Sequence, residues 1–310
     1  MKQTVWRVED YIVPLNMDGL AGRMLYVPAP KGKNREILFV YGHHSSLERW
    51  GGVIQDLNQY GAVTMPDLPG FGGMDSLYKR GEQPTVDNLA DYLAAFVKLR
   101  YRRKKVTIAG LSFGFVVVTR MLQRYPELVK QVDVLISVVG FAHHDDFTFS
   151  RSRYLFYRYS AGFFSYRVTA AFFRNICLHP LVLKTVYRHT HNAKDKFVNH
   201  DRATLKQLLD FEVYLWRCNE VQTYMKTTVE FLTLDNCAKQ VDLPVWHVSV
   251  KTDKYFDNHL VEQHMRVVFN DFHNLPSKMD THAPSVIADM ESAAPLLPKK
   301  LRQLLNSQTS

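Results

Sequence analysis

The 310-residue chain has few cysteines: Cys177, Cys218 and Cys237 are far apart, and none forms a CxxC pair. An odd number of widely spaced cysteines argues against a disulfide framework and against a structural zinc site, and it suits a reducing compartment. The first thirty residues also lack the apolar run of a signal peptide. We therefore expect a cytoplasmic protein that is not marked for export.

Long hydrophobic runs are missing as well. The longest nearly apolar stretch, residues 106–118, is interrupted by glycine, serine and threonine, and it is shorter than the roughly 18 residues that a membrane-spanning helix needs. The phosphate-binding patterns GxxxxGK[ST] and GxGxxG are both absent, and no nucleic-acid-binding motif accompanies the basic residues. We expect no cofactor, no metal and no nucleic-acid partner.

The composition is that of a soluble globular protein, with 46% hydrophobic, 13% aromatic and 22% charged residues. The net charge is +9, from 39 Lys and Arg against 30 Asp and Glu, which favours anionic surfaces or substrates. Acidic residues are absent from 147–194, a segment rich in aromatic residues. Its basic residues are Arg151, Arg153, Arg158, Arg167, Arg174, Lys184, Arg188 and Lys194.

The hydrophobic pattern predicts an α/β fold. Buried strands are predicted at five apolar runs, residues 36–41, 62–65, 105–109, 132–139 and 245–250. Helices are predicted between the first four runs, at residues 47–60, 86–99 and 113–124. This alternation implies βαβ units and a mostly parallel sheet with helices on both faces. Two shorter runs, 5–13 and 23–27, flank a turn signal at 16–19 and predict an antiparallel hairpin.

Strand character stops over residues 141–233, which are helix-like and aromatic and include a strongly amphipathic stretch at 203–223. Strand character then resumes, and a final helix is predicted at 285–305. A helical insertion between two halves of one sheet accounts for this pattern. We predict a core domain of residues 1–140 and 234–310, with residues 141–233 inserted as a helical cap.

The strongest local signal is the sequence Gly110-Leu111-Ser112-Phe113-Gly114, between a predicted strand and a predicted helix. A turn this sharp forces its central residue toward an unfavourable backbone conformation, and the two glycines remove Cβ atoms that would collide. Ser112 would then project above the sheet, where the N–H of Phe113 can meet a developing oxyanion. The pattern predicts a nucleophilic serine, and a tight turn without chemistry is the alternative.

Two further motifs follow the neighbouring strands. GHH stands at 42–44, and DLPGFG stands at 67–72. Together with the serine turn they resemble the α/β-hydrolase superfamily, over about residues 37–139 and 244–305. The resemblance implies an oxyanion hole made by the backbone N–H groups of His43 and Phe113. The family's usual His-Gly is Tyr-Gly here, so the expectation depends on the shape of the loop.

A nucleophilic serine needs an acid and a base to activate it. In the α/β-hydrolase chain order the acid follows the serine, and the resemblance assigns it to Asp253, just after the strand at 245–250. Asp257 is the first rival, although it suits the N-cap of a helix that starts near residue 258. Asp235 is the second, but it precedes the strand.

The histidine comes last in that order, and the resemblance assigns the general base to His282, just before the final helix. His273 is the competitor. His259 and His264 lie within a helix-like stretch, which makes them weaker alternatives.

These residues predict a serine hydrolase that cleaves a carboxylic ester or thioester through an acyl-enzyme. Amide hydrolysis and C–C bond hydrolysis on the same fold remain alternatives, as does a catalytically silent protein that binds an apolar ligand. Haloalkane dehalogenase and epoxide hydrolase activities are disfavoured. Members of those two kinds that resemble this chain carry an aspartate where Ser112 stands.

Seven phenylalanines between residues 147 and 173 are too many apolar rings for a solvated loop. We expect some of them, Phe163 and Phe164 among these, to line a pocket for an apolar acyl group. The basic residues would lie outside, either drawing the cap weakly toward anionic membrane surfaces or simply solvated. The histidines at 143–146 and 189–191 lack the spacing of a zinc site, so we expect a solvated entrance there.

Overall fold

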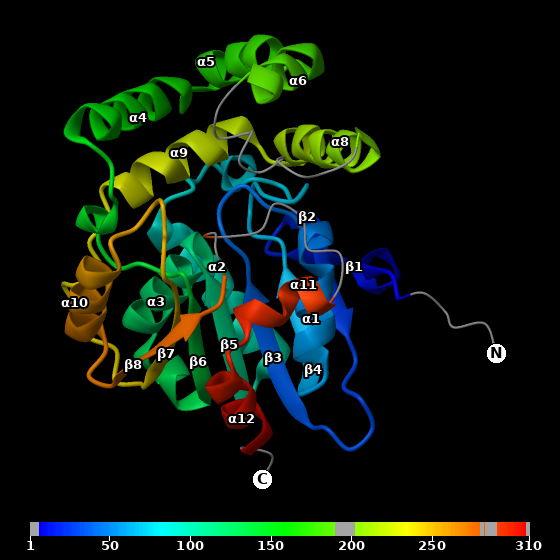
Figure 1. The fold of residues 1–310 in the computed structure, drawn as a ribbon, viewed down its shortest axis with the longest axis vertical. Coiled ribbons are helices and arrows are strands. Elements are labelled where there is room, and N and C mark those ends of the chain that lie inside the picture. Colours follow the sequence, from blue (N-terminus) through cyan, green and yellow to red (C-terminus); the bar gives the residue numbers. More distant parts are fainter. Residues whose placement is uncertain (1–5, 190–201, 280–281, 283–289, 308–310) are drawn as a thin grey trace.

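An eight-stranded sheet in the order β1-β2-β4-β3-β5-β6-β7-β8 forms the centre of the protein (Figure 1). The computed structural model describes residues 6–189, 202–279, 282 and 290–307. Strands β3 to β8 pair in parallel, whereas β1 and β2 are attached antiparallel beside β4. The strands are β1 Ile12–Met17, β2 Leu20–Val27, β3 Arg35–Val40, β4 Gly61–Pro66, β5 Val106–Leu111, β6 Val132–Val138, β7 Val245–Val250 and β8 Phe272–Ser277.

Strands β4 and β5 are buried along their whole length, and β3 and β6 at all but one residue each, as the continuous apolar runs predict. The predicted hairpin is present, and Asp18 and Gly19 both have positive φ, 57° and 76°, as a tight two-residue turn requires. The prediction of a first strand at residues 5–13 is wrong in its position. Val8–Tyr11 is a 3₁₀-helix and β1 begins at Ile12, on the sheet edge where Pro14 is tolerated.

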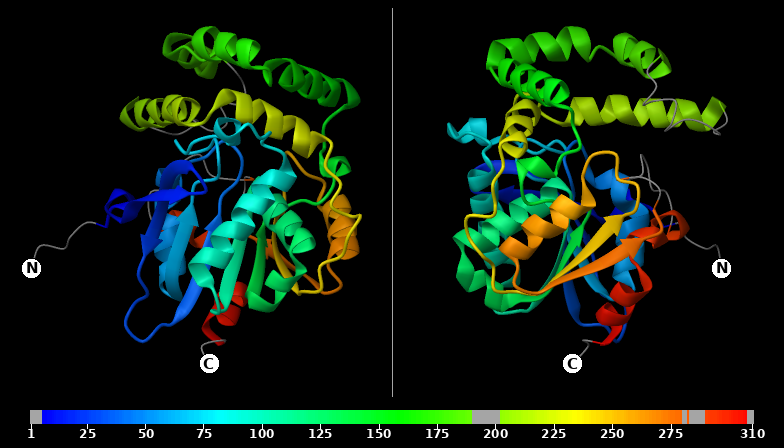
Figure 2. Two further views of the ribbon diagram at one scale, coloured as in Figure 1. Left: turned by 180° about the vertical axis from the view of Figure 1, so that it is seen from behind. Right: turned by 60° about the vertical axis from the view of Figure 1, so that its left-hand side comes forward.

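Helices cover both faces of the sheet (Figures 1 and 2). One face carries α1 Gly51–Asn58, α11 Met290–Ala293 and α12 Lys299–Ser307, and the other carries α2 Val86–Tyr101, α3 Phe113–Arg124 and α10 Asn258–Val268. The predicted helix at 47–60 begins as the 3₁₀-helix Leu47–Trp50. The predicted final helix is interrupted in its described part, because Pro295 and Pro298 each remove a backbone donor. Residues 285–289 lie outside the described residues.

Between β6 and β7 the chain forms a second layer over the carboxyl ends of the parallel strands (Figures 1 and 2). We call it the helical layer; it consists of α4 Arg151–Phe164, α5 Arg167–Phe172, the π-helical turn Phe173–Cys177, α6 Pro180–His189, α8 Arg202–Cys218 and α9 Val221–Leu232. The amphipathic stretch at 203–223 is broken after α8, where the Asn219 side chain accepts a hydrogen bond from the Gly72 N–H. Among the described helices, none has the length and apolarity needed to cross a bilayer.

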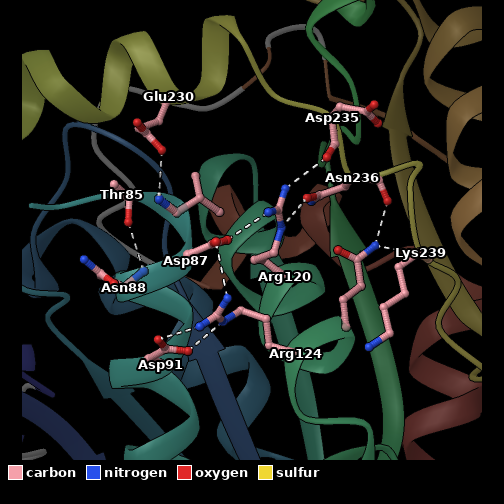
Figure 3. A network of polar contacts seen from close by, with 12 residues as sticks. Thr85, Asp87, Asn88, Asp91, Arg120, Arg124, Glu230, Asp235, Asn236 and Lys239 are labelled. Atoms are coloured by element: carbon pink, nitrogen blue, oxygen red, sulfur yellow. Dashed lines mark hydrogen bonds and ion pairs between the residues drawn. The ribbon is translucent and has the colours of Figure 1, made fainter.

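A polar network fixes the end of the helical layer to α2 and α3 (Figure 3). The Arg120 guanidinium donates to the Asp87 carboxylate at 2.8 Å and to the Asp235 carbonyl at 3.0 Å. The Glu230 carboxylate, on α9, accepts a hydrogen bond from the Val86 N–H at the start of α2. The return of the chain to the core is therefore held at several points.

Candidate active site

Ser112 lies on the sharp turn between β5 and α3 and has φ of 49° and ψ of −119°. A Cβ at Gly110 would lie 2.6 Å from the Cα of Phe115, and one at Gly114 would lie 2.3 Å from the Val40 carbonyl oxygen. Only glycine fits either position, because these neighbours are backbone atoms that cannot move aside. The turn therefore holds Ser112 in a strained conformation at the carboxyl edge of the sheet.

Three predicted site residues meet at this edge. The Nε2 atom of His282 lies 3.1 Å from the Oγ atom of Ser112, and its Nδ1 atom lies 2.7 Å from Oδ2 of Asp253. The other carboxylate oxygen of Asp253 accepts hydrogen bonds from the N–H groups of Tyr255, at 2.8 Å, and Phe256, at 3.2 Å. The turn after β7 thus orients the carboxylate toward the imidazole.

The Asp253 carboxylate remains ionised in this setting. Its side chain is 3% exposed, and burial by itself would raise its pKa. The hydrogen bond and charge interaction with His282 and the two backbone N–H donors outweigh burial and hold the pKa below its usual range. An ionised carboxylate only accepts hydrogen bonds, so Nδ1 of His282 carries a proton, and in the neutral ring Nε2 is then the acceptor that faces Ser112.

The competing residues have other partners. Asp257 caps α10, because its carboxylate accepts the N–H groups of His259 and Leu260 at 2.8 and 3.2 Å. His273 lies on β8, a strand not predicted from the sequence, where it stacks on Trp246 with ring centroids 4.0 Å apart. These contacts engage Asp257 and His273 away from Ser112.

The loop after β3 approaches the serine turn closely. A Cβ at Gly42 would lie 2.9 Å from a side-chain carbon of Leu111 and 3.2 Å from the Cβ of Ser112. The backbone of the next residue, His43, is one of the two predicted oxyanion-hole donors, and that of Phe113, the first residue of α3, is the other. The absence of a side chain at Gly42 is what permits this approach.

The side chain of His43 has a structural place. Its ring lies 4.2 Å from the Tyr224 ring and 5.1 Å from the Phe231 ring, both on α9, and Nε2 lies 2.9 Å from the Thr227 hydroxyl. Burial, reinforced by neighbouring His44, lowers its pKa to about 3. The neutral ring thus joins the oxyanion loop to the helical layer.

Tyr41, which replaces the family's usual histidine, anchors the start of the same loop. Its hydroxyl donates to the buried carboxylate of Asp67, the first residue of the DLPGFG motif, at 2.5 Å. The Arg23 guanidinium, from β2, donates to the other carboxylate oxygen at 3.3 Å. Sequence reasoning missed Arg23, because its partner lies 44 residues away along the chain.

Aromatic rings surround the hydrogen-bonded groups. Those of Tyr255 and Phe256 lie 5.2 and 5.1 Å from the His282 ring. Phe256 also stacks on Phe141 at 4.6 Å, and Phe141 contacts Phe231 of α9 at 6.3 Å. Sequence reasoning missed these rings as well, although Tyr255 and Phe256 stand only two and three residues after Asp253 and so had a positional signal.

The two phenylalanines expected to line the pocket lie elsewhere, and this expectation is corrected. Phe163 is 58% exposed at the end of α4. Phe164 packs against Phe173 at 4.6 Å, within the helical layer itself. The end of α4 does not reach the site, because α9 lies between α4 and the core (Figure 1).

A histidine cluster marks the point where the chain enters the helical layer. The rings of His144 and His264 lie 4.1 and 4.5 Å from that of His143. The fully buried carboxylate of Asp146 bonds Nδ1 of His264 at 2.6 Å and accepts the His143 N–H at 3.0 Å. Potential metal-ligand atoms of His143, His144 and Asp145 lie within 4.8 Å of one another. The side chain of His189, and His191, lie outside the described residues, so the solvated entrance expected between the two histidine groups stays a prediction.

A buried histidine on β7 leads to a prediction about how folding stability depends on pH. His247 on β7 has Nδ1 2.9 Å from the Ser137 hydroxyl, and burial lowers its pKa to about 4. In the unfolded chain the pKa is about 6.5, so the unfolded state binds more protons between these values. The histidine's contribution is therefore complete above about pH 6.5 and is lost as the pH falls toward 4, at a cost of roughly 3 kcal/mol.

We expect His247→Gln, which keeps a hydrogen-bonding group for Ser137, to have a flatter pH dependence. The free energy of unfolding of the wild type and the variant, measured in urea between pH 7 and 4, should converge toward low pH. Parallel curves would contradict a neutral buried His247.

The mostly parallel sheet, its two helical faces and the strained serine turn define an α/β hydrolase. Within that superfamily the chain belongs to the family described as serine aminopeptidase, S33, whose model matches residues 32–271. Among curated proteins, no sequence relative matches the chain.

Solved structures share the fold over almost the whole chain. An esterase from Thermogutta terrifontis has a TM-score of 0.62 and 17% identity, over 96% of this chain and 99% of that one. An enol-lactonase from Burkholderia xenovorans has a TM-score of 0.64 and 13% identity, over 96% and 100%. A variant of an epoxide hydrolase from Bacillus megaterium has a TM-score of 0.63 and 14% identity, over 94% and 98%. At these identities the similarity establishes the fold alone.

Proposed function

We propose that the protein is a serine hydrolase that cleaves a carboxylic ester or thioester with an apolar acyl group. The observation that carries this proposal is the hydrogen-bonded series from Asp253 through His282 to Ser112, with distances of 2.7 and 3.1 Å. A serine hydroxyl is a poor nucleophile until a base removes its proton. The imidazole supplies that base, and the ionised carboxylate holds it in the required tautomer.

The reaction runs through two similar halves. Ser112 Oγ attacks the acyl carbon while Nε2 of His282 takes its proton, and the oxyanion accepts hydrogen bonds from the N–H groups of His43 and Phe113. The imidazolium then protonates the leaving alcohol or thiol, which departs and leaves an acyl-enzyme. A water molecule, deprotonated by the same nitrogen, repeats the attack and releases the acid and free Ser112.

The apolar surroundings support an apolar acyl group. Phe141, Phe231 and Phe256 form a continuous aromatic wall that reaches from His282 to α9. Such a wall favours hydrocarbon over polar groups, because burial of apolar surface drives binding. We propose that residues 141–233 act as the cap over this site, with residues 1–140 and 234–310 as the core domain.

Amide hydrolysis is the second candidate, favoured by the family description of serine aminopeptidases. The same three residues would serve it, with His282 protonating a leaving amine. Parallel assays of p-nitrophenyl esters of increasing chain length and of the matching p-nitroanilides separate the two. We expect the esters to be turned over faster and the preference to rise with acyl length.

Labelling with a fluorophosphonate tests the whole proposal, because this probe reacts only with an activated serine. We expect the wild type to be labelled and Ser112→Ala to remain unlabelled. An unlabelled wild type would instead favour a silent protein that binds an apolar ligand.

The acid can be tested with two neighbouring aspartates. Asp253→Asn keeps the shape of the side chain but removes the charge that holds His282, so we expect kcat to fall about 10³-fold or more. Asp257→Asn should leave kcat nearly unchanged, since asparagine also caps helices well. Steady-state kinetics on a soluble ester gives both values, and the opposite ranking would move the acid to Asp257.

A further inference from the structure

The helical layer exposes an unusual amount of apolar surface. Among the described residues, nine of the fourteen large hydrophobic side chains that are exposed fall within residues 156–182. They are Phe156, Tyr159, Phe163, Tyr166, Val168, Phe172, Ile176, Leu181 and Val182. Scattered exposed hydrophobics are ordinary, but nine of them within one 27-residue segment are typical of an interaction surface.

All nine side chains lie on α4, α5 and α6 or on the turns that join these helices. Helices α4, α5 and α6 form the row of the helical layer that lies farthest from the sheet, which we call the outer row (Figures 1 and 2). Phe156, Tyr159 and Phe163 follow the i, i+3, i+7 spacing of a single helix face on α4. The opposite side of α4 is already occupied, since the Tyr154 hydroxyl donates to the Leu232 carbonyl at the end of α9. The exposed face is therefore an additional apolar surface.

The charge of the outer row identifies the kind of partner. Arg151, Arg158, Arg167 and Arg174 are all exposed, and no Asp or Glu occurs anywhere in 147–194. Within the described part of the chain, none of these four arginines forms an ion pair with a carboxylate. A second copy of the chain would bring like charges together, whereas a bilayer with anionic headgroups offers both hydrocarbon and negative charge.

We propose that the outer row is a docking surface for an anionic lipid bilayer. The exposed rings enter the boundary between headgroups and acyl chains, and the arginines pair with lipid phosphates. Phe163 then has its role at the membrane and not in the acyl pocket. The substrate is by extension an acyl lipid taken from the bilayer, a part of the inference that rests on the proposed hydrolase function.

Co-sedimentation of the full chain with vesicles tests the docking. We expect binding to vesicles that contain about one third phosphatidylglycerol in phosphatidylcholine, at least tenfold tighter than to pure phosphatidylcholine. Raising the salt from about 0.05 to 0.5 M should weaken it, because exposed charges are then screened. Wild-type protein that does not bind the anionic vesicles at low salt overturns the proposal.

Matched double variants locate the surface. Phe156→Ser with Phe163→Ser should lower the partition coefficient at least tenfold, whereas Leu99→Ser with Val267→Ser, exposed apolar residues on α2 and α10, should not. Equal effects of the two pairs would overturn the assignment to the outer row.

A second matched set tests the charges. Arg151→Gln with Arg158→Gln should weaken binding severalfold, and should do so more than Arg103→Gln with Lys300→Gln, exposed cations outside the helical layer, after α2 and on α12. Equal weakening by both pairs would mean that net charge alone is responsible, which overturns a specific surface. A wild-type dimer that the phenylalanine variant converts to a monomer, without vesicle binding, would assign the surface to a second copy.

Activity assays separate this proposal from the hydrolase function. The outer-row variants should hydrolyse p-nitrophenyl acetate at the wild-type rate but lose activity on a long-chain acyl ester presented in anionic vesicles. Ser112→Ala should bind vesicles normally and hydrolyse neither substrate. Vesicle binding by a wild-type protein without hydrolase activity would remove the proposed function and leave the docking surface intact. Equal loss on both substrates by the outer-row variants would overturn the delivery of substrate from the bilayer.

Discussion

Replacement of Ser112 by alanine is expected to lower kcat for ester hydrolysis about 10⁴-fold or more. The alanine variant has no Oγ to form the acyl-enzyme, and only the oxyanion hole and substrate binding remain to accelerate the reaction. The site should otherwise persist, because the unusual turn is fixed by Gly110 and Gly114 and not by the serine side chain. Pre-steady-state and steady-state kinetics with a p-nitrophenyl ester measure the loss.

A serine elsewhere provides the control. The hydroxyl of Ser160 hydrogen-bonds to the carbonyl of Phe156 within α4, so Ser160→Ala should keep full activity on a soluble ester. Thermal unfolding of both variants near the wild-type Tm would confirm that they are folded. A Ser112→Ala protein that retains more than about a tenth of kcat would rule out Ser112 as the nucleophile, since that loss amounts to only about 1.4 kcal/mol of barrier.

His282→Ala is expected to have an effect of similar size, a fall in kcat of about 10³-fold or more. Without the imidazole, no group within hydrogen-bond distance of Ser112 Oγ accepts its proton among the described contacts. His273→Ala is the matched control, because it removes an imidazole that stacks on Trp246 at the sheet edge. It should cost a little stability and leave kcat within about twofold of the wild type.

The pair of histidine variants is measured on a soluble ester near neutral pH. If His273→Ala were inactive and His282→Ala active, the base would be His273 and the hydrogen bond at 3.1 Å would have no catalytic meaning. If both were active, a mechanism with a histidine base would be wrong.

Much of the fold followed from local pattern. The limits of α3 and β7 agree with the predicted helix at 113–124 and the predicted strand at 245–250, because both are strongly apolar and are bounded by turn residues. β8 escaped prediction, because a sheet-edge strand with His273, Asn274 and Pro276 has little apolar alternation. The segment is a strand because it pairs with β7, and this pairing cannot be read from its own residues.

The helices of the helical layer could be predicted from the sequence, but the way they pack on the core could not. Its aromatic composition predicted buried rings, yet Phe163 is exposed, whereas Phe231 of α9 contacts Phe141. Which face of a helix turns inward depends on the helix packed against it, and α9, not α4, lies next to the core. No spacing within α4 contains that information.

The sequence by itself determined the serine turn, because the requirement for Gly110 and Gly114 arises within a few residues of Ser112 and is local. It also determined the α/β alternation, which depends on short-range periodicity. The resemblance assigned Asp253 and His282, but only the tertiary structure brings them to the serine, since His282 lies 170 residues further along the chain and meets it where parallel strands end at one edge of the sheet. The exposure of Phe163 was decided at the same level, because α9 lies between α4 and the sheet.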